Sequence, residues 1–272
     1  MAFKAVVVAA LSSVVLVGCG GGSGSGSSNS EYSLSDYEGR DVNLDSYAGT
    51  WVAVGTGSYT YSEESFSDNE TLAAKEYFVV TGSPQAGYEK ASCSGDYLEI
   101  VTVSGDQISF GLFEGTLAEN GVITGEYVDD SSYQGDTDIT RLKMTMMKIS
   151  DSTSSIGSLM VNEGNGNITT SDINCYQQVN GKGSYNNPED GNTKYTSEYY
   201  YSNAVEIFSY TDSEKNIGID LYDARVYLQN YLNDSVSFDV TSRSTLSETI
   251  DFNGSNDSTS VVGSISIQLP AQ

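Results

Sequence analysis

The chain has 272 residues, with 37 acidic and 12 basic side chains, no histidine and a formal net charge of −25. A charge of this size and sign argues against nucleic acid and anionic membrane surfaces as partners. The lack of histidine removes histidine-containing catalytic triads, histidine zinc sites and the usual neutral-pH general base. Hydrophobic residues amount to 38 %, including 20 tyrosines and 8 phenylalanines, which is enough for the core of a folded acidic protein.

The first residues have the composition of an export signal. Lys4 precedes a run over 5–17 that is apolar or small and too short for a comfortable bilayer span. Leu16-Val17-Gly18-Cys19 ends this run with a large apolar residue, a small residue and a cysteine, and only glycine and serine fill 20–28. These features resemble the signal peptide, lipobox and tether of a bacterial lipoprotein.

The resemblance to lipoproteins implies cleavage before Cys19, diacylglycerol on its thiol and a further fatty acid, such as palmitate, on its amine. Two or more acyl chains give stable membrane attachment, whereas one gives marginal binding. Gly20 stands where inner-membrane retention signals have Asp, which favours the outer membrane, with the domain facing either the periplasm or the cell surface. An ordinary secretory signal with an incidental cysteine is the alternative.

Three segments follow from this interpretation. We expect a signal peptide over 1–18, a Gly/Ser-rich tether over 19–36 and a single β-rich domain over 37–272. The polar stretch at 150–155 marks a sub-boundary within the domain.

The cysteines predict a covalent link. With Cys19 carrying lipid, Cys93 and Cys175 are the only pair left, and an exported chain meets an oxidising compartment. We therefore expect a Cys93–Cys175 disulfide, which would straddle the sub-boundary and favours one cohesive unit. Two free, buried thiols are the alternative.

Alternation of apolar and polar side chains dominates the domain. It is clearest over 108–112, 142–146, 236–240 and 265–269. This period is typical of antiparallel strands with one buried and one wet face. Gly105-Asp106 and Asn120-Gly121 suit tight turns and predict hairpins within a meander of at least four strands over about 97–149.

Helix signals are few. Apolar residues at helical spacing over 224–232 predict one short amphipathic helix, and a strand with Val226 and Leu228 inward is the alternative. The predicted fold class is all-β: an antiparallel meander that forms a barrel or a β-sandwich, with at most one or two short helices.

Gly49-Thr50-Trp51 resembles the Gly-x-Trp motif at the start of the first barrel strand in lipocalins and lipocalin-like lipoproteins. The resemblance covers about ten residues from Val42 and implies an up-and-down barrel in which Trp51 closes one end. A β-sandwich or an elaborated barrel remains the alternative. Independently of any family, a tryptophan on a first strand is most simply a core residue.

Carboxylate catalysis is the common enzymatic route that remains, because glycosidases need only a pair of Asp or Glu. Adjacent acids occur at Glu63-Glu64, Asp129-Asp130 and Glu189-Asp190, all in polar, turn-like contexts where a solvated surface is the simpler interpretation.

Oxygen-bearing residues spaced two apart are candidate calcium ligands. They occur at Asp136/Asp138, Asn165/Asn167 and Asp251/Asn253. None fits an EF-hand loop, and such residues also satisfy their own turns. We therefore expect no metal and no cofactor.

Tyr199-Tyr200-Tyr201 is the densest aromatic run. Aromatic faces stack on sugars and serve protein contacts, but on a strand the middle ring points away from its two neighbours. Packing within the core and across strands is the simpler role.

The sequence thus predicts an envelope lipoprotein, held at the membrane through lipid on Cys19. Its non-catalytic domain would bind a small apolar ligand or an envelope component, such as an envelope protein, and no nucleic acid. The alternatives are a structural or interaction lipoprotein without a small-molecule pocket, and a carboxylate-dependent glycan hydrolase.

Overall fold

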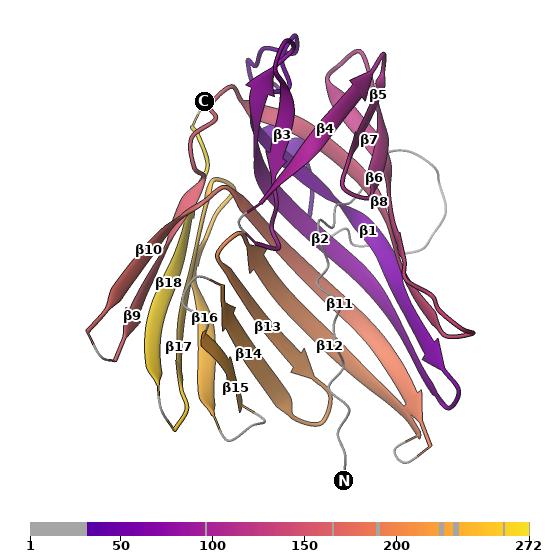
Figure 1. The fold of residues 1–272 in the computed structure, drawn as a ribbon, viewed down its shortest axis with the longest axis vertical. Coiled ribbons are helices and arrows are strands. Elements are labelled where there is room, and N and C mark those ends of the chain that lie inside the picture. Colours follow the sequence, from indigo (N-terminus) through magenta and orange to yellow (C-terminus); the bar gives the residue numbers. More distant parts are fainter. Residues whose placement is uncertain are drawn as a thin grey trace.

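The computed structural model describes residues 32–95, 97–164, 166–188, 191–222, 226–230, 234–257 and 259–271. Within these ranges the chain forms two antiparallel sheets, preceded by a three-residue 3-10 turn, η1 (Ser35–Tyr37) (Figure 1). No helix in the described part is long and apolar enough to cross a membrane. The all-β prediction is confirmed. The signal peptide, the lipobox and the tether as far as residue 31 lie outside the described residues.

Eight strands form a closed ring. They are β1 (Gly49–Glu63), β2 (Phe66–Ser83), β3 (Gly87–Ala91), β4 (Leu98–Ser104), β5 (Gln107–Phe110), β6 (Phe113–Leu117), β7 (Val122–Asp130) and β8 (Thr137–Ser150). Each pairs with the next along the chain, and β8 pairs back with β1. The predicted meander is therefore present, with Gly105 and Gly121 in its turns at φ +66° and +80°.

Five more strands extend the same sheet beyond the ring. They are β11 (Cys175–Asn187), β12 (Gly191–Ser202), β13 (Val205–Thr211), β14 (Lys215–Leu221) and β15 (Val226–Gln229). The long strand β2 makes this branching possible: one edge pairs with β1, and the other pairs first with β11 and then with β3. In Figure 1 the short strands β3–β6 lie at the top, and β11–β15 continue the sheet below them.

The second sheet covers one face of this extension. It contains β9 (Gly157–Glu163), β10 (Ile168–Ile173), β16 (Ser235–Arg243), β17 (Ser247–Ser255) and β18 (Ser260–Gln268), in the order β10-β9-β18-β17-β16. The chain enters it over 151–156, at the predicted sub-boundary, yet both sheets contribute to one apolar cluster that includes Tyr176, Ile207, Leu159 and Phe252. A ring and a sandwich are thus both present.

Alternation along β1 feeds two cores at once. Trp51 and Ala53 point into the ring, whereas Val52 and Val54 point into the layer between the sheets, and all four are at most 3 % exposed. A slip of one residue would exchange the two sets, so burial on both faces fixes the register of this strand.

The short helix predicted over 224–232 is wrong for the part described. Val226–Gln229 forms the edge strand β15, paired with β14, and Leu228 is fully buried between the sheets. The strand that was the alternative interpretation of this segment is therefore present. The spacing of Val226 and Leu228 suits a strand as well, and pairing satisfies the otherwise open edge of β14. Ala224, Tyr231 and Leu232 lie outside the described residues.

The segment that leads into β1 is tied to the sheets. Tyr37 is 4 % exposed and shares a hydrogen bond of 2.6 Å with the hydroxyl of Tyr77. Arg40 donates to the backbone oxygens of Ile149 and Pro270, which joins this segment to the end of β8 and to the C-terminal segment.

Candidate functional site

Aromatic and aliphatic side chains fill the ring. The rings of Trp51 and Phe78 lie nearly parallel with centroids 6.5 Å apart, and Phe110 packs 6.0 Å from Phe78. A void of about 10 Å³ remains among them, which is room for about one water molecule. This part of the ring therefore leaves no space for a small apolar ligand.

Gly49 and Trp51 lie at the start of the first strand of the ring. Gly49 has a φ of +144°, a conformation that side chains rarely adopt. Trp51 is 3 % exposed, and its indole nitrogen donates to the backbone oxygen of Tyr47 at 2.8 Å. The tryptophan is thus a satisfied core residue near one end of the ring.

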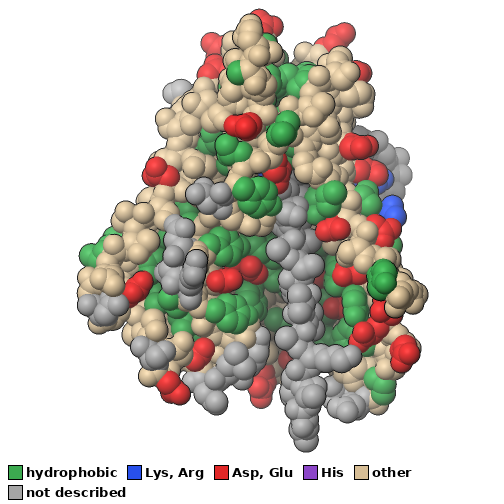
Figure 2. All heavy atoms as spheres, viewed as in Figure 1, with side chains coloured by type: hydrophobic (Ala, Val, Ile, Leu, Met, Phe, Trp, Pro, Cys, Tyr) green, Lys and Arg blue, Asp and Glu red, His purple; other side chains and the backbone are tan. Residues whose placement is uncertain are grey.

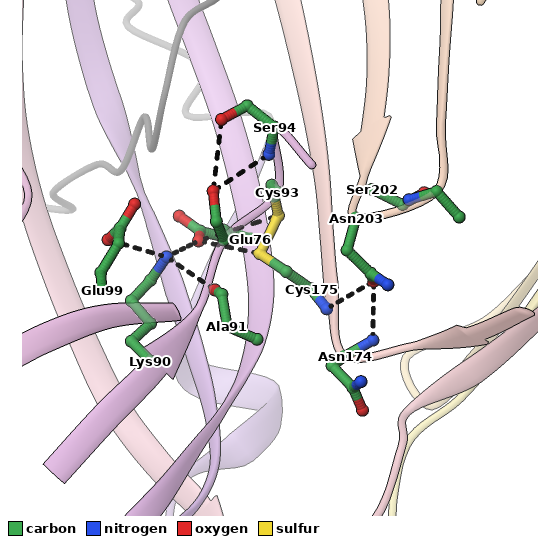
Figure 3. The surroundings of a disulfide bond; sticks show 12 residues. Glu76, Lys90, Ala91, Cys93, Ser94, Glu99, Asn174, Cys175, Ser202 and Asn203 are labelled. Atoms are coloured by element: carbon green, nitrogen blue, oxygen red, sulfur yellow. Dashed lines mark hydrogen bonds and ion pairs between the residues drawn. A yellow bond between two sulfur atoms is a disulfide. The ribbon is translucent and has the colours of Figure 1, made fainter. Parts of the chain in front are cut away.

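Three charged side chains lie buried inside the ring. The Lys90 ammonium is 2.9 Å from Glu76 and 3.7 Å from Glu99, and the Lys90 and Glu76 side chains are 0 % exposed (Figure 3). The same ammonium lies 4.8 and 5.4 Å from the ring centres of Phe78 and Phe110. We call these three residues the ion cluster; carboxylates and aromatic faces together hold its cation.

Burial and pairing act in opposite directions on the ion cluster. Burial raises the pKa of Glu76 to about 7, although Lys90 lowers it. Burial lowers the pKa of Lys90, but Glu76 and Glu99 outweigh this effect and raise it overall. Since the cluster is enclosed, its role is to hold the interior together rather than to meet a ligand.

The predicted disulfide is present beside the ion cluster. Cys93, which follows β3, is bonded to Cys175 at the start of β11, so the bridge ties the ring to the extension (Figure 3). Glu76 Oε1 lies 3.3 Å from Cys175 Sγ. Although Glu76 and both sulfurs are close enough to share a metal, bonded sulfurs have no thiolate to offer.

The register places many tyrosines on one face of the large sheet. Below the ion cluster, the face that lines the ring continues across β1, β2, β11, β12, β13 and β14. We call this continuation the tyrosine face; its residues are Tyr59, Tyr61, Phe66, Asp68, Glu70, Tyr185, Tyr195, Ser197, Tyr199, Tyr201, Glu206, Phe208, Tyr210 and Asp220.

The aromatic rings of this face form a continuous row. Tyr61 contacts Phe66 at 5.9 Å between centroids, and Phe66 contacts Tyr185 at 6.0 Å. Tyr195 continues the row at 6.3 Å from Tyr185 and at 4.6 Å from Tyr210. The row crosses from β1 to β13, between segments about 150 residues apart in sequence.

A second aromatic group lies beside this row. Tyr199 stacks on Tyr201 at 5.8 Å and on Phe208 at 6.2 Å. Tyr200 points the other way, into the layer between the sheets, and is 0 % exposed. The prediction that the middle tyrosine of the run faces away from its neighbours is confirmed.

Carboxyl groups sit among these rings. Tyr195 donates to Asp68 at 2.8 Å, and Ser197 donates to Glu70. Burial raises the pKa of Asp68 and raises that of Glu70 to about 7. These hydroxyl bonds fix the two carboxyls in place while the low polarity disfavours their charge.

A second acidic pair lies next to the stacked tyrosines. Glu206 pairs with Tyr201 and Asp220 across neighbouring strands. Burial, and then Asp220, raise the pKa of Glu206 to about 7. Tyr201 is 3 % exposed, and its hydroxyl has no hydrogen-bond partner among the described residues. The site therefore holds an unused polar group beside two carboxyls.

The tyrosine face carries acidic side chains without basic ones. None of the residues that define it is Lys or Arg. Figure 2 shows hydrophobic and acidic side chains interspersed over β12–β14, without basic ones among them.

The opposite face of the extension carries a different feature. A cleft of about 300 Å³ lies there, with Lys182, Thr196, Thr211 and Lys215 in its lining. These four residues stand in one row across β11–β14. Both lysines are exposed, so the cleft is an open polar surface.

The acid pairs singled out from sequence lie on different elements where the structure describes them. Glu63-Glu64 lies at the turn between β1 and β2, and Asp129-Asp130 ends β7, with β8 between β1 and β7 in the sheet. Glu189-Asp190 lies outside the described residues.

The calcium candidates also serve local structure. Asp136 bridges Tyr133 through backbone bonds in the β7–β8 connection, and Asn253 donates to Ser237 on the neighbouring strand. Asn165 lies outside the described residues.

Sequence reasoning missed the ion cluster and the acids of the tyrosine face. A signal was present: Glu76 continues the every-second-residue series of Leu72, Ala74 and Phe78, which places a glutamate at a core position of β2. No protein-family model, curated protein or solved structure matches this chain.

Proposed function

We propose that this chain is a lipid-anchored lipoprotein of the bacterial outer membrane whose folded part is a non-catalytic binding module. The lipid on Cys19 holds it at the membrane, and the tyrosine face holds an envelope component or another extended ligand. The continuous row of rings across β1–β13 carries this proposal.

The filled ring supports binding on the face rather than inside. A void of about 10 Å³ does not admit the small apolar ligand considered from sequence. The tyrosine face combines flat rings with carboxyl oxygens, which suits a partner that lies along the sheet and offers hydrogen-bond donors.

Replacing tyrosines of the face by leucine tests whether the face binds a ligand. The full chain, expressed with its own leader and purified in a nonionic detergent, is screened against immobilised neutral, cationic and anionic oligosaccharides and lipids. We expect at least one ligand whose affinity falls tenfold or more in Tyr195→Leu and Tyr210→Leu. Tyr133→Leu is the control, because Tyr133 is 71 % exposed and lies outside the tyrosine face, in the connection between β7 and β8. Binding to none of the panel in a tyrosine-dependent way would remove the proposal.

The anchor has its own test. Cells given labelled palmitate should incorporate it into the protein, and Cys19→Ser should abolish incorporation. Label that survives this substitution would mean that Cys19 is not the acylated residue.

A carboxylate-dependent glycan hydrolase is the second candidate, because Asp68 and Glu70 are neighbours on one strand face and Glu70 has a pKa of about 7. A raised carboxyl beside another acid is what a general acid requires. Release of reducing sugar from the bound glycans, abolished by Glu70→Gln, would favour this candidate over simple binding.

A further inference from the structure

We propose that the tyrosine face binds an oligosaccharide of unacetylated amino sugars, whose ammonium groups suit its carboxyls and whose sugar faces suit its aromatic rings. The inference rests on the proposed function, because it specifies the ligand chemistry of the same face. Three features carry it: the acids, the rings and an unpaired hydroxyl.

The acids give the face its charge complementarity. Asp68, Glu70, Glu206 and Asp220 all belong to it, and no described position of the face is basic. An anionic partner would meet only repulsion, whereas each ammonium group that binds favours the ionised form of a nearby carboxyl.

The rings favour a cation as well. An ammonium group is attracted to the face of an aromatic ring within about 6 Å, most strongly where water is excluded. The molecule already uses this chemistry internally: Lys75 lies 5.4 Å from the Tyr32 ring, 5.2 Å from the Tyr77 ring and 3.7 Å from Glu248. Lys90 in the ion cluster is held in the same way, by carboxylates and rings together.

The third feature is a polar group without a partner. The Tyr201 hydroxyl is buried and unbonded within the described residues, and its residue stands next to Glu206 in the register. A buried hydroxyl left unpaired costs free energy, and an N–H or O–H donor of a ligand at this place would satisfy it.

The length of the face points to an extended ligand. It crosses six strands, from β1 to β14, so at about 4.8 Å per strand spacing it spans roughly 24 Å. Several ammonium groups along a chain can therefore meet several carboxyls at once, which raises affinity beyond that of a single amine.

Two matched sugars test the proposal. A glucosamine hexasaccharide and its fully N-acetylated counterpart share a backbone and differ in charge, and spermine supplies ammonium groups without sugar. Calorimetry on the full chain in nonionic detergent should show the glucosamine hexasaccharide binding at least tenfold more tightly than the acetylated one. Affinity should fall as NaCl rises from about 50 to about 500 mM, since the contacts are ionic.

Charge-removing variants complete the test. Asp68→Asn with Glu206→Gln should weaken binding of the glucosamine hexasaccharide at least tenfold. Glu126→Gln, at a side chain that is 61 % exposed and paired with Lys143 on β8, should leave it unchanged.

Each outcome decides between explanations. Weaker binding of spermine than of the glucosamine sugar supports the assignment to amino sugars. Spermine binding as tightly as the glucosamine sugar, or more tightly, would overturn that assignment and give the face to polyamines. Equal, tyrosine-dependent binding of the acetylated sugar would overturn the ammonium inference while the proposed function stands. Failure of spermine and the glucosamine sugar to bind below about 1 mM would also overturn it, and the wider ligand panel would then decide the proposed function separately.

Discussion

Removal of the buried cation in the ion cluster is the sharpest test of the structure. Lys90→Met keeps an unbranched apolar stem between the rings of Phe78 and Phe110 but deletes the ammonium 2.9 Å from Glu76 and 3.7 Å from Glu99. Two carboxyls are then left inside the ring without their cation.

The size of the effect follows from burial. Removing one partner of a buried ion pair typically costs about 3–5 kcal/mol, because the other charge is left uncompensated. A domain is stable by only about 5–15 kcal/mol, so Lys90→Met should lose a large share of the free energy of unfolding.

The loss should depend on pH. Burial already raises the pKa of Glu76 to about 7, and loss of Lys90 raises it further. Near pH 5 the Glu76 carboxyl of the variant is protonated and needs no cation. Near pH 8 the unfolded chain has released this proton, whereas the folded variant retains it or buries an unpaired charge, which costs up to about 1.4 kcal/mol for each unit of added pKa shift. The destabilisation should therefore grow from pH 5 to pH 8.

Guanidinium chloride unfolding, followed by tryptophan fluorescence, measures this directly. Trp51 is the only tryptophan, is 3 % exposed and lies inside the same ring. Lys143→Met is the control, because its pair with Glu126 is exposed and should change stability by less than about 0.5 kcal/mol. A loss below about 1 kcal/mol for Lys90→Met at pH 8, or equal losses at both pH values, would refute the reasoning.

Three further predictions concern the disulfide and the tyrosine face. Replacing Cys93 and Cys175 by serine should lower the free energy of unfolding by about 2–4 kcal/mol, and an unchanged denaturation midpoint would contradict the bridge. Because burial raises the pKa of Glu70 to about 7, the folded state holds a proton that the unfolded state releases above about pH 4.5. Its contribution to stability is full below that pH and is lost as pH rises through 7, so Glu70→Gln should reduce the fall in stability measured between pH 5 and 8; an unaltered fall would count against it. A Cβ at Gly183 would lie 2.5 Å from the Tyr195 ring, so Gly183→Ala should displace that ring and lower the melting temperature, while the original temperature would argue against this packing.

Local patterns determined most of the strands. An alternation such as that of Leu142, Met144 and Met146 arises wherever a strand has one buried and one solvent-exposed face. It therefore predicts the strand without knowledge of the partner strand. The pairing of Cys93 with Cys175 followed because Cys19 was reserved for lipid, and the structure confirms it. The anchor itself stays a prediction from the sequence.

The candidate site was only partly foreseen. The sequence showed that Tyr199 and Tyr201 share a surface, because strand geometry alone separates them from Tyr200. It did not show that Tyr195 meets Tyr210 or that Asp68 accepts from Tyr195, since these contacts join different strands.

Sequence by itself determined the all-β class, the hairpin turns and the cysteine pairing, because each depends on local spacing or on elimination among few residues. Only the tertiary structure decided that β8 closes on β1 and that β2 branches to β11. Those pairings join segments about 100 residues apart, and their register is chosen by burial on both faces of the sheet rather than by any local preference. The ion cluster and the tyrosine face exist only once that register is set.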